Sequence, residues 1–455
     1  MKTDLSREYQ TLKQDFDDLK LQNLSLNMAR GKPGKEQLEL SMPLLDVLNS
    51  GSDCLAADGT DCRNYGGLEG IIDARKLFSE YLEVSPEEIM ITGSSSLIFM
   101  YDTISRAMLT GVLGSKKPWS HYNRPKFICP VPGYDRHFSI CEFLGIEMLP
   151  VTMDDNGPNM ELVEELVKND ETIKGIWCVP KYSNPSGITY SDETVRRLAA
   201  METKAEDFRI FWDQAYAYHF LDPNTDTVLL NLLEACKKAG HPNRAYLFAS
   251  TNKITFPGAG VAFFAASEEN IAYAKKQLSM QAISWDKLNM LRHVRFFKNM
   301  SGIHNHMCKH ATLLKPRFYI VMRSLEKELL PRGLGTYTIP QGGYFITYMA
   351  PHGCAKRIVA LCKEVGITLT DAGATYPYGN DPDDSCIRIA PSFPSCKELE
   401  TAMNVFCKMA RLAAVRSSLK NRERIKIGNP GTGKGARFFS DRRFCTGESV
   451  VYEIS

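Results

Sequence analysis

The chain has 455 residues, 44% of them hydrophobic and 24% charged, with a formal net charge of +2. This length is enough for about two or three domains, and the composition excludes a wholly disordered chain. The near balance of 55 basic and 53 acidic residues gives no reason to expect nucleic acid as a partner. The longest nearly apolar run, residues 256–266, is too short to span a bilayer, and the charged start MKTDLSREYQ lacks the apolar segment of a signal peptide. We therefore expect a soluble, cytoplasmic protein with no membrane partner.

The sequence contains thirteen cysteines, an unusually high number for a chain of this kind. None of them forms a C-x-x-C pair, and no cysteine–histidine group has the spacing of a zinc site. We expect reduced, mostly buried thiols and no metal site.

The N-terminal region, residues 1–45, is predicted to be a helix followed by an arm that joins the smaller domain. Between residues 6 and 27, Tyr9, Leu12, Phe16 and Leu19 recur at steps of three and four, which places them on one helical face. A glycine–proline turn at residues 30–34 then interrupts the helical pattern.

From residue 55 to residue 265, short apolar runs alternate with amphipathic stretches. This alternation predicts an α/β domain with a mainly parallel, doubly wound sheet, which we assign to residues 46–300. The expected strands are residues 89–92, 126–129, 148–151, 175–179, 209–212, 245–249 and 260–265. Expected helices between them include residues 159–168 and 192–203.

The following region mixes helices with short strands, which predicts a smaller α+β domain at residues 301–420. Its expected elements are a long helical stretch at 269–328, strands at 337–339, 343–348 and 387–390, and helices at 354–365 and 397–418. Residues 421–455 are rich in Arg, Lys and Gly and are predicted to form a flexible tail. Residues 428–435 nearly match a phosphate-binding P-loop, but Gly435 replaces the required hydroxyl residue, so we expect no such site there.

The candidate functional residues follow the predicted strands, where open α/β sheets bind ligands. They are Gly93-Ser94-Ser95-Ser96, Pro132-Gly133-Tyr134, Ser183-Asn184-Pro185-Ser186-Gly187, Asp213-Gln214-Ala215-Tyr216, Ser250-Thr251-Asn252-Lys253 and, far downstream, Arg388.

These residue types suit a phosphorylated pyridine aldehyde and an amino acid. Lys253 can form a Schiff base with an aldehyde, and Asp213 can keep a pyridine nitrogen protonated. Backbone N–H groups at a helix that starts near Ser94 and Ser95 can hold a phosphate.

The remaining candidates would contact the ring or the substrate. Tyr216, assisted by Asn184, can hydrogen-bond a ring hydroxyl oxygen; Tyr134 can stack on the ring. Arg388 offers a planar fork for an α-carboxylate. Each residue alone has a structural alternative, such as a surface lysine, a helix N-cap or a core aromatic. The combination, rather than any single residue, indicates the chemistry.

In this order, the motifs resemble those of the class I aminotransferases, the aspartate-aminotransferase-like pyridoxal-phosphate enzymes, over about residues 28–410. S-N-P-S-G, D-x-x-Y and S-T-N-K are the most specific, and residues 341–345 (QGGYF) resemble a motif of the family's small domain. The phrases MARGKP, GTDCRNYGG, WCVPKYSNPSG and STNKITFPGAG resemble the type Ic bacterial aspartate aminotransferases.

The resemblance implies a homodimer with active sites shared between subunits and pyridoxal 5'-phosphate as the cofactor. It implies that Lys253 forms the Schiff base and later moves the substrate proton, and that Tyr65 reaches the neighbouring subunit's phosphate. The implied catalytic set is Lys253, Tyr65, Asp213 and Tyr216. The implied cofactor-binding set adds Ser94, Ser95, Ser96, Tyr134, Asn184 and Ser250, and the substrate-binding set is Arg388, Gly31, Asn184 and Arg30.

One departure from the family concerns the cofactor phosphate. Many relatives carry an arginine about eight residues after the lysine, whereas residues 254–261 contain none. The phosphate charge would then be met by the helix dipole, by hydroxyl groups or by another cation such as Lys32 or Lys181.

The expected reaction is transamination of L-aspartate with 2-oxoglutarate by a ping-pong cycle. An acidic substrate needs a second cation, since an unpaired buried carboxylate is costly. Arg30, Lys287 and Arg292 are the candidates, and we favour the segment 285–292. The alternatives are an aminotransferase for aromatic or branched amino acids, a lyase with this fold, or a non-catalytic regulator. A regulator would be expected to have lost Lys253 or Asp213.

Overall fold

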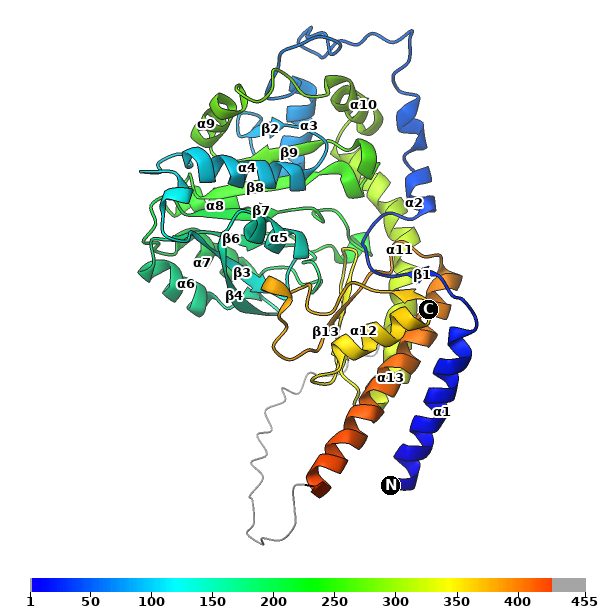
Figure 1. Ribbon diagram of the computed structural model, residues 1–455. Helices are drawn as coiled ribbons and strands as arrows, with labels where there is room; N and C mark the ends of the chain where they lie inside the picture. The colour runs from blue at the N-terminus through cyan, green and yellow to red at the C-terminus, as the bar shows by residue number, and fades with distance from the viewer. Residues whose placement is uncertain (1, 428–455) are drawn as a thin grey trace.

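An eight-stranded, mainly parallel sheet forms the centre of the larger part of the structure (Figure 1). The computed structural model describes residues 2–427. The strand order is β2-β9-β8-β7-β6-β3-β4-β5, and only β9 and β5 run antiparallel to their neighbours. The strands are β2 (Ile89–Ile91), β3 (Lys126–Val131), β4 (Glu147–Asp154), β5 (Gly157–Pro158), β6 (Ile173–Cys178), β7 (Arg209–Asp213), β8 (Ala245–Ser250) and β9 (Ala262–Ala265). The seven strands expected in this region are confirmed; the two-residue β5 was not predicted.

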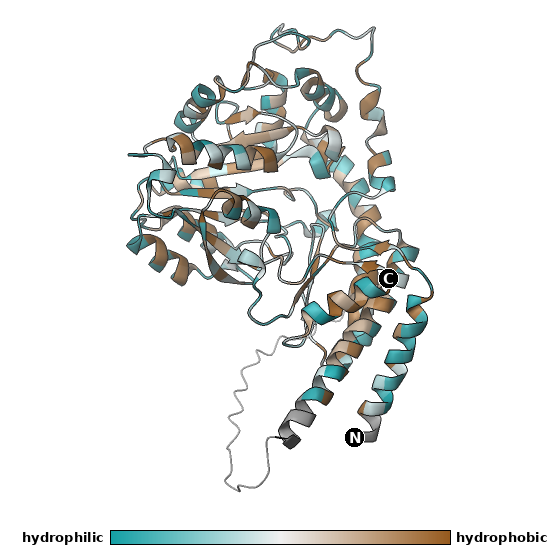
Figure 2. Ribbon diagram, viewed as in Figure 1, coloured by the Kyte–Doolittle hydropathy of each residue, from teal (hydrophilic) through white to brown (hydrophobic). Residues whose placement is uncertain are grey.

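Helices cover both faces of this sheet, which buries the central strands completely. Every residue of β6, β7 and β8 is buried, which explains why these strands read as continuous apolar runs. Figure 2 shows the same concentration of hydrophobic residues along the strands. The covering helices are α3 (Ile72–Leu82), α4 (Ser96–Thr110), α5 (Asp135–Phe143), α6 (Met160–Asn169), α7 (Asp192–Ala200), α8 (Leu232–Lys238), α9 (Glu268–Leu278) and α10 (Lys287–Phe297).

Two short sheets and long helices form the smaller part of the structure. β10 (Thr336–Tyr337), β11 (Ile346–Met349) and β13 (Cys386–Ile389) form an antiparallel sheet, while β1 (Leu26–Asn27) pairs in parallel with β12 (Ile367–Thr368). The helices are α1 (Lys2–Lys20), α2 (Lys35–Glu39), α11 (Met300–Glu328), α12 (Ala355–Glu364) and α13 (Cys396–Ile427). The predicted boundaries at residues 45, 300 and 420 stay predictions.

The N-terminal helix α1 lies beside α13 in the smaller part (Figure 1). Arg411 pairs with Glu8 at 2.8 Å, and Lys408 pairs with Asp15 at 3.2 Å. The apolar face predicted from the helical spacing supplies the buried Leu12 to this contact.

Four predicted helices have different bounds; the one expected at residues 192–203 is α7, which ends at Ala200. The first was expected to reach residue 27, but α1 ends at Lys20 and Asn23 takes a left-handed φ of 49°, which stops a helix. The stretch 269–328 is three helices, with Lys298 at a φ of 66° between the last two. The final helix continues past residue 418 to Ile427, into the segment predicted as a tail. The P-loop-like run 428–435 lies outside the described residues.

Two further expectations concern the cysteines and the membrane. Most cysteines in residues 2–427 are buried and none of these is paired in a disulfide, which agrees with the prediction. Within the same range, no helix combines the length and the apolar character needed to cross a membrane.

Candidate active site

Two adjoining hollows open at the carboxyl ends of β6, β7 and β8. The inner hollow has a volume of about 220 Å³ and the outer one about 610 Å³. Both are lined by Gly31, Lys32, Tyr134, Asn184, Tyr216 and Lys253. Because they share these walls, a molecule in the inner hollow would contact a molecule in the outer one.

Lys253 lies at the junction of the two hollows, at the end of the short 3-10 helix η4 (Thr251–Lys253) that follows β8. Its Nζ lies 5.4 Å from the centre of the Tyr216 ring. Burial lowers the pKa of Lys253 below its ordinary value of 10.5; the carboxylate of Asp213 opposes this shift, and the guanidinium of Arg388 adds to it. The side chain is thus more readily deprotonated than a free lysine, as a base or nucleophile requires.

This pKa shift can be tested on the cofactor-free protein. We expect acetic anhydride to modify Lys253 with a half-maximal pH below 10.5, because burial disfavours the ammonium form. Asp213→Asn should lower this midpoint further, since it removes the charge that stabilises the ammonium. Peptide mass spectrometry across a pH series measures the midpoint, with the exposed Lys35 as internal reference. A Lys253 midpoint at or above that of Lys35 would contradict the assignment.

Asp213 ends β7 with a buried, fixed carboxylate. Its Oδ2 lies 3.1 Å from Nε2 of His137, and its Oδ1 accepts a hydrogen bond from the backbone N–H of Ala215 at 3.1 Å. His137 in turn stacks on Trp177 with ring centres 4.1 Å apart. The carboxylate therefore lines the inner hollow in one orientation, as a group must if it is to accept a hydrogen bond from a ring nitrogen.

Four consecutive residues at the start of α5 serve the site. Tyr134 lines both hollows, Asp135 contacts Arg388, Arg136 lines the outer hollow and His137 contacts Asp213. Of these four residues, only Tyr134 was predicted from the sequence. The other three read as ordinary residues of a first helical turn; the available signal was that α5 begins directly after the carboxyl end of β3.

Arg388 projects from β13 into the outer hollow and is only 5% exposed. One guanidinium nitrogen contacts Asp135 at 2.9 Å and donates to Oδ1 of Asn184 at 3.2 Å. Its Nε has no hydrogen-bond partner among the described residues. Across the hollow, a Cβ at Gly31 would lie 2.5 Å from the Phe345 ring, so a larger residue there would have to displace this ring.

Hydroxyl groups gather at the far end of the inner hollow. Ser95 is the N-cap residue of α4, and the Oγ of Ser96 lies 3.5 Å from that of Ser250. Oδ1 of Asn252, which also lines this hollow, is buried without a partner among residues 2–427. Ser94 is not among the lining residues. The helix start and the hydroxyl groups suit a phosphate.

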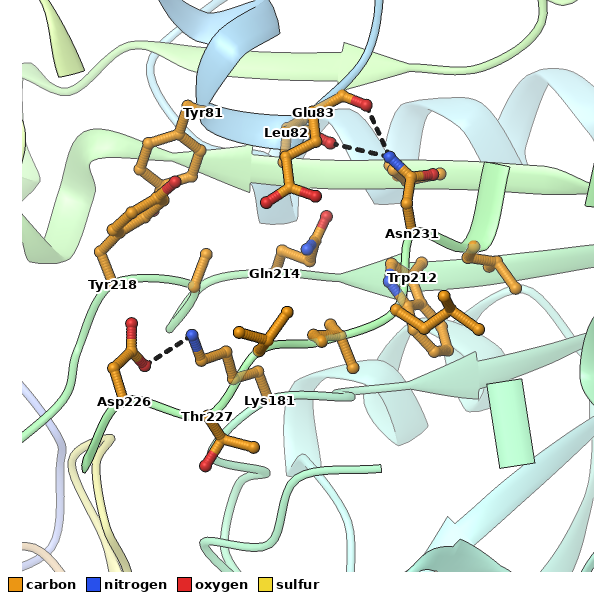
Figure 3. Close-up of a pocket in the computed structure, with 16 residues that line it drawn as sticks. Tyr81, Leu82, Glu83, Lys181, Trp212, Gln214, Tyr218, Asp226, Thr227 and Asn231 are labelled. Atoms are coloured by element: carbon orange, nitrogen blue, oxygen red, sulfur yellow. Dashed lines mark hydrogen bonds and ion pairs between the residues drawn. The ribbon is translucent and has the colours of Figure 1, made fainter. Parts of the chain in front are cut away.

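The two cations considered for the phosphate charge lie in different places. Lys32 lines the inner hollow, and no arginine within the described range does so. Lys181 instead lines a separate pocket of about 110 Å³, where it pairs with Asp226 at 2.7 Å (Figure 3). Gln214 lines this separate pocket as well. Of the two cations, only Lys32 lines the inner hollow, and its Nζ lies 3.8 Å from the centre of the Phe393 ring.

Outside both hollows of the chain lie three other candidates: Tyr65, Lys287 and Arg292. Tyr65 is 78% exposed, and its carbonyl oxygen accepts a hydrogen bond from Nζ of Lys287 at 3.2 Å. Arg292 contacts Asn289 in α10. Within one chain, the favoured segment 285–292 therefore does not line the outer hollow, whereas Arg30 does.

The residues of the inner hollow fit a phosphorylated pyridine aldehyde. An amine (Lys253), a fixed carboxylate (Asp213), an aromatic ring (Tyr134) and a helix start with hydroxyl groups line one space. Each corresponds to one part of that molecule: aldehyde, ring nitrogen, ring face and phosphate.

Comparisons with known proteins agree with this fit. The family model described as aspartate aminotransferase matches residues 1–422. An aspartate aminotransferase of Corynebacterium glutamicum is 45% identical over 406 residues, 89% of this chain and 93% of that protein. A putative aminotransferase of Mycolicibacterium smegmatis is 44% identical over 419 residues, 91% of this chain and 97% of that protein. A crystal structure of an aspartate transaminase from C. glutamicum superposes with a TM-score of 0.88 at 43% identity, covering 91% of this chain and 97% of that one. The chain therefore belongs to the aspartate aminotransferase family, whose members use pyridoxal phosphate, and it is an aminotransferase.

Proposed function

We propose that the chain transfers the amino group of L-aspartate to 2-oxoglutarate in a ping-pong cycle, with pyridoxal phosphate in the inner hollow. The observation that carries this proposal is the charge of the outer hollow. Its lining includes the cations Arg30, Lys32, Arg136 and Arg388 and the acidic residues Asp135 and Asp371, besides Lys253 at the junction. This excess of cations favours substrates that carry two carboxylates.

In this proposal the cofactor, when bound, supplies an aldehyde that accepts the amino group and a ring that takes up electrons. The chain's residues bind, orient and move protons. Asp213 holds positive charge at the ring nitrogen, Tyr134 packs on the ring, and Tyr216 with Asn184 orients it. Lys253 removes the proton at the substrate Cα, for which its lowered pKa suits it.

Arg388 is proposed to bind the substrate α-carboxylate in the place that Asp135 occupies in this structure. Both are carboxylates, and the guanidinium nitrogen that donates to Asp135 at 2.9 Å can donate to the substrate carboxylate instead. The unpartnered Nε of Arg388 leaves a further donor for the substrate.

Arg136 and Arg30 are proposed to bind the side-chain carboxylate. Both are exposed, line the outer hollow and form no ion pair within residues 2–427. We expect Arg136→Met and Arg30→Met each to raise KM for L-aspartate, because a charge-assisted hydrogen bond is lost. The variant with the larger effect should raise KM about tenfold or more. Arg292→Met, outside the hollow, serves as the matched control.

Steady-state kinetics with L-aspartate and L-leucine separate binding of the side chain from a general defect. Arg136→Met and Arg30→Met should lose the preference for L-aspartate over L-leucine, because their kinetics with L-leucine should change little. If only Arg292→Met changes KM for L-aspartate, the cation comes from segment 285–292, and the assignment to Arg136 and Arg30 is wrong.

We also propose a homodimer in which Tyr65 reaches the inner hollow of the other subunit. The 78% exposure of this tyrosine and its position outside the hollows of its own chain support the proposal. Light scattering during size-exclusion chromatography should give twice the mass of 51.1 kDa.

An absorption spectrum of the purified holoenzyme tests the proposed reaction. Adding L-aspartate should bleach the visible band of the bound cofactor, and adding 2-oxoglutarate should restore it. A band that responds to an aromatic or branched amino acid but not to L-aspartate would reject the substrate assignment. A band that bleaches and does not return with any 2-oxo acid would favour a lyase.

A further inference from the structure

The backbone that carries Lys253 is held by buried side chains from three separate segments of the chain. The carbonyl oxygen of Lys253 lies 3.2 Å from Nε2 of His219 and accepts a hydrogen bond from the Tyr344 hydroxyl, also at 3.2 Å. The next carbonyl, that of Ile254, lies 2.9 Å from Nε2 of His306 in α11. These two carbonyls follow a single turn of 3-10 helix, so side chains satisfy them in place of a continuing helix.

The hydrogen bonds continue from these side chains to the N-terminal arm. Gln37 in α2, which is fully buried, donates its amide to the Tyr344 hydroxyl at 2.9 Å. The same amide nitrogen lies 3.0 Å from Nδ1 of His310, and Oε1 of Gln37 accepts from the backbone N–H of Gly34 at 3.1 Å. Nε2 of His310 lies 3.1 Å from Nε2 of His306. A continuous buried path therefore connects Gly34 with the backbone of Lys253.

The direction of the central hydrogen bonds is fixed by chemistry. Because Tyr344 donates its one proton to the carbonyl of Lys253, its oxygen is free to accept from Gln37. Gln37 must present its NH₂ group to Tyr344, since its oxygen already accepts from Gly34. Neither residue can reverse its role without leaving a buried polar group unpaired.

The path carries no net charge near neutral pH. Burial lowers the pKa of His219 to about 3 and lowers those of His306 and His310 as well. Burial also raises the pKa of Tyr344. The path therefore acts on Lys253 through geometry, without adding a charge beside its amine.

The other end of the path lies in the wall of the hollows. Gly31 and Lys32 line both hollows, and Gly34 and Gln37 follow them in the same arm. We propose that Gln37 and Tyr344 are positioning residues, which tie the arm that contacts the substrate to the backbone that carries Lys253. This inference rests on the proposed role of Lys253.

The test compares three variants of the holoenzyme with a matched control. Tyr344→Phe removes one buried hydroxyl, Gln37→Met removes the amide at similar size, and the double variant removes both. The control is Tyr246→Phe, which removes another buried tyrosine hydroxyl, bonded to Asn270 at 3.3 Å and away from both hollows.

The first readout is hydrogen–deuterium exchange of peptides that cover residues 29–41 and 250–256. We expect Gln37→Met to accelerate exchange in 250–256, and Tyr344→Phe to accelerate it in 29–41, although neither substitution lies in the affected peptide. Tyr246→Phe should change neither peptide.

The second readout is a double-mutant cycle on kcat. Each single variant should lower kcat about three- to tenfold, the effect of one lost hydrogen bond. The double variant should fall no further than the larger single effect, because both substitutions interrupt one path. Additive losses with no remote change in exchange would overturn the proposal, and so would a control that behaves like Tyr344→Phe.

The two readouts also separate this inference from the proposed function. If wild-type protein shows no transamination of L-aspartate, the proposed substrate is wrong, while the exchange data still decide whether the arm and the Lys253 backbone are linked. If transamination is normal and the remote peptides do not respond, the linkage alone is rejected.

Discussion

Replacing Lys253 by methionine is expected to lower kcat for transamination about 10⁴-fold or more, because the site would lose its base and the amine at the junction of the two hollows. Methionine keeps the length and apolar stem of the side chain, so the packing around η4 should be retained. A coupled assay for oxaloacetate formation measures the loss, and circular dichroism checks the fold.

Lys181→Met provides the matched control for this experiment. Lys181 is also a buried lysine after a strand of the same sheet, but it faces the separate pocket and pairs with Asp226 (Figure 3). Its replacement should leave kcat within about twofold of wild type. A near-normal rate in Lys253→Met would contradict the assignment of Lys253 as the base and nucleophile.

Replacing Asp213 by asparagine is the second substitution with a large expected effect. We expect kcat to fall about 10²- to 10³-fold, since a buried, pre-oriented charge contributes this much to a developing transition state. Asparagine has nearly the same shape: its oxygen can accept from the N–H of Ala215 while its NH₂ donates to Nε2 of His137 in the tautomer that accepts there, so the loss reports mainly the charge. Asp213→Glu should be less severe because the charge is retained.

Asp207→Asn separates this effect from a general loss of stability. Asp207 lies just before the other end of β7, where its buried carboxylate contacts Nζ of Lys174 at 2.7 Å. Breaking this pair should lower the free energy of unfolding by about 3–5 kcal/mol, while kcat of the folded fraction stays near wild type. Urea unfolding should show that Asp207→Asn is the less stable variant, whereas kcat should be lower in Asp213→Asn. If Asp213→Asn is the less stable variant and keeps its kcat, Asp213 is a structural residue.

The central sheet was predictable from sequence because burial on both faces produces an unmistakable pattern. β7 consists of Arg209 followed by three large apolar residues and Asp213, and its apolar residues pack into cores on opposite faces of the sheet. A polar residue that ends such a strand lies at the edge where open α/β sheets bind ligands, and this position identified Asp213 before any contact was known.

The rest of the site depends on contacts between distant segments. Nothing in the local sequence of Asp135 indicates that it pairs with Arg388, 253 positions away. His306 and His310 likewise read as residues of a long helix until α11 is placed against the arm. The predicted helix was also wrong at residues 26–27, because the pairing of these residues with β12 overrides the helical spacing.

Neighbouring residues in the first turn of α5 differ in how tightly other site residues hold them. Asp135 and His137 are held by other site residues, whereas Arg136 is exposed and forms no hydrogen bond or ion pair within residues 2–427. An exchange at this position disturbs no partner and leaves the reaction machinery intact. On the proposed role of Arg136 in binding the side-chain carboxylate, one codon change would alter the substrate range at little cost to folding, so directed evolution of new amino-acid preferences should begin at residue 136.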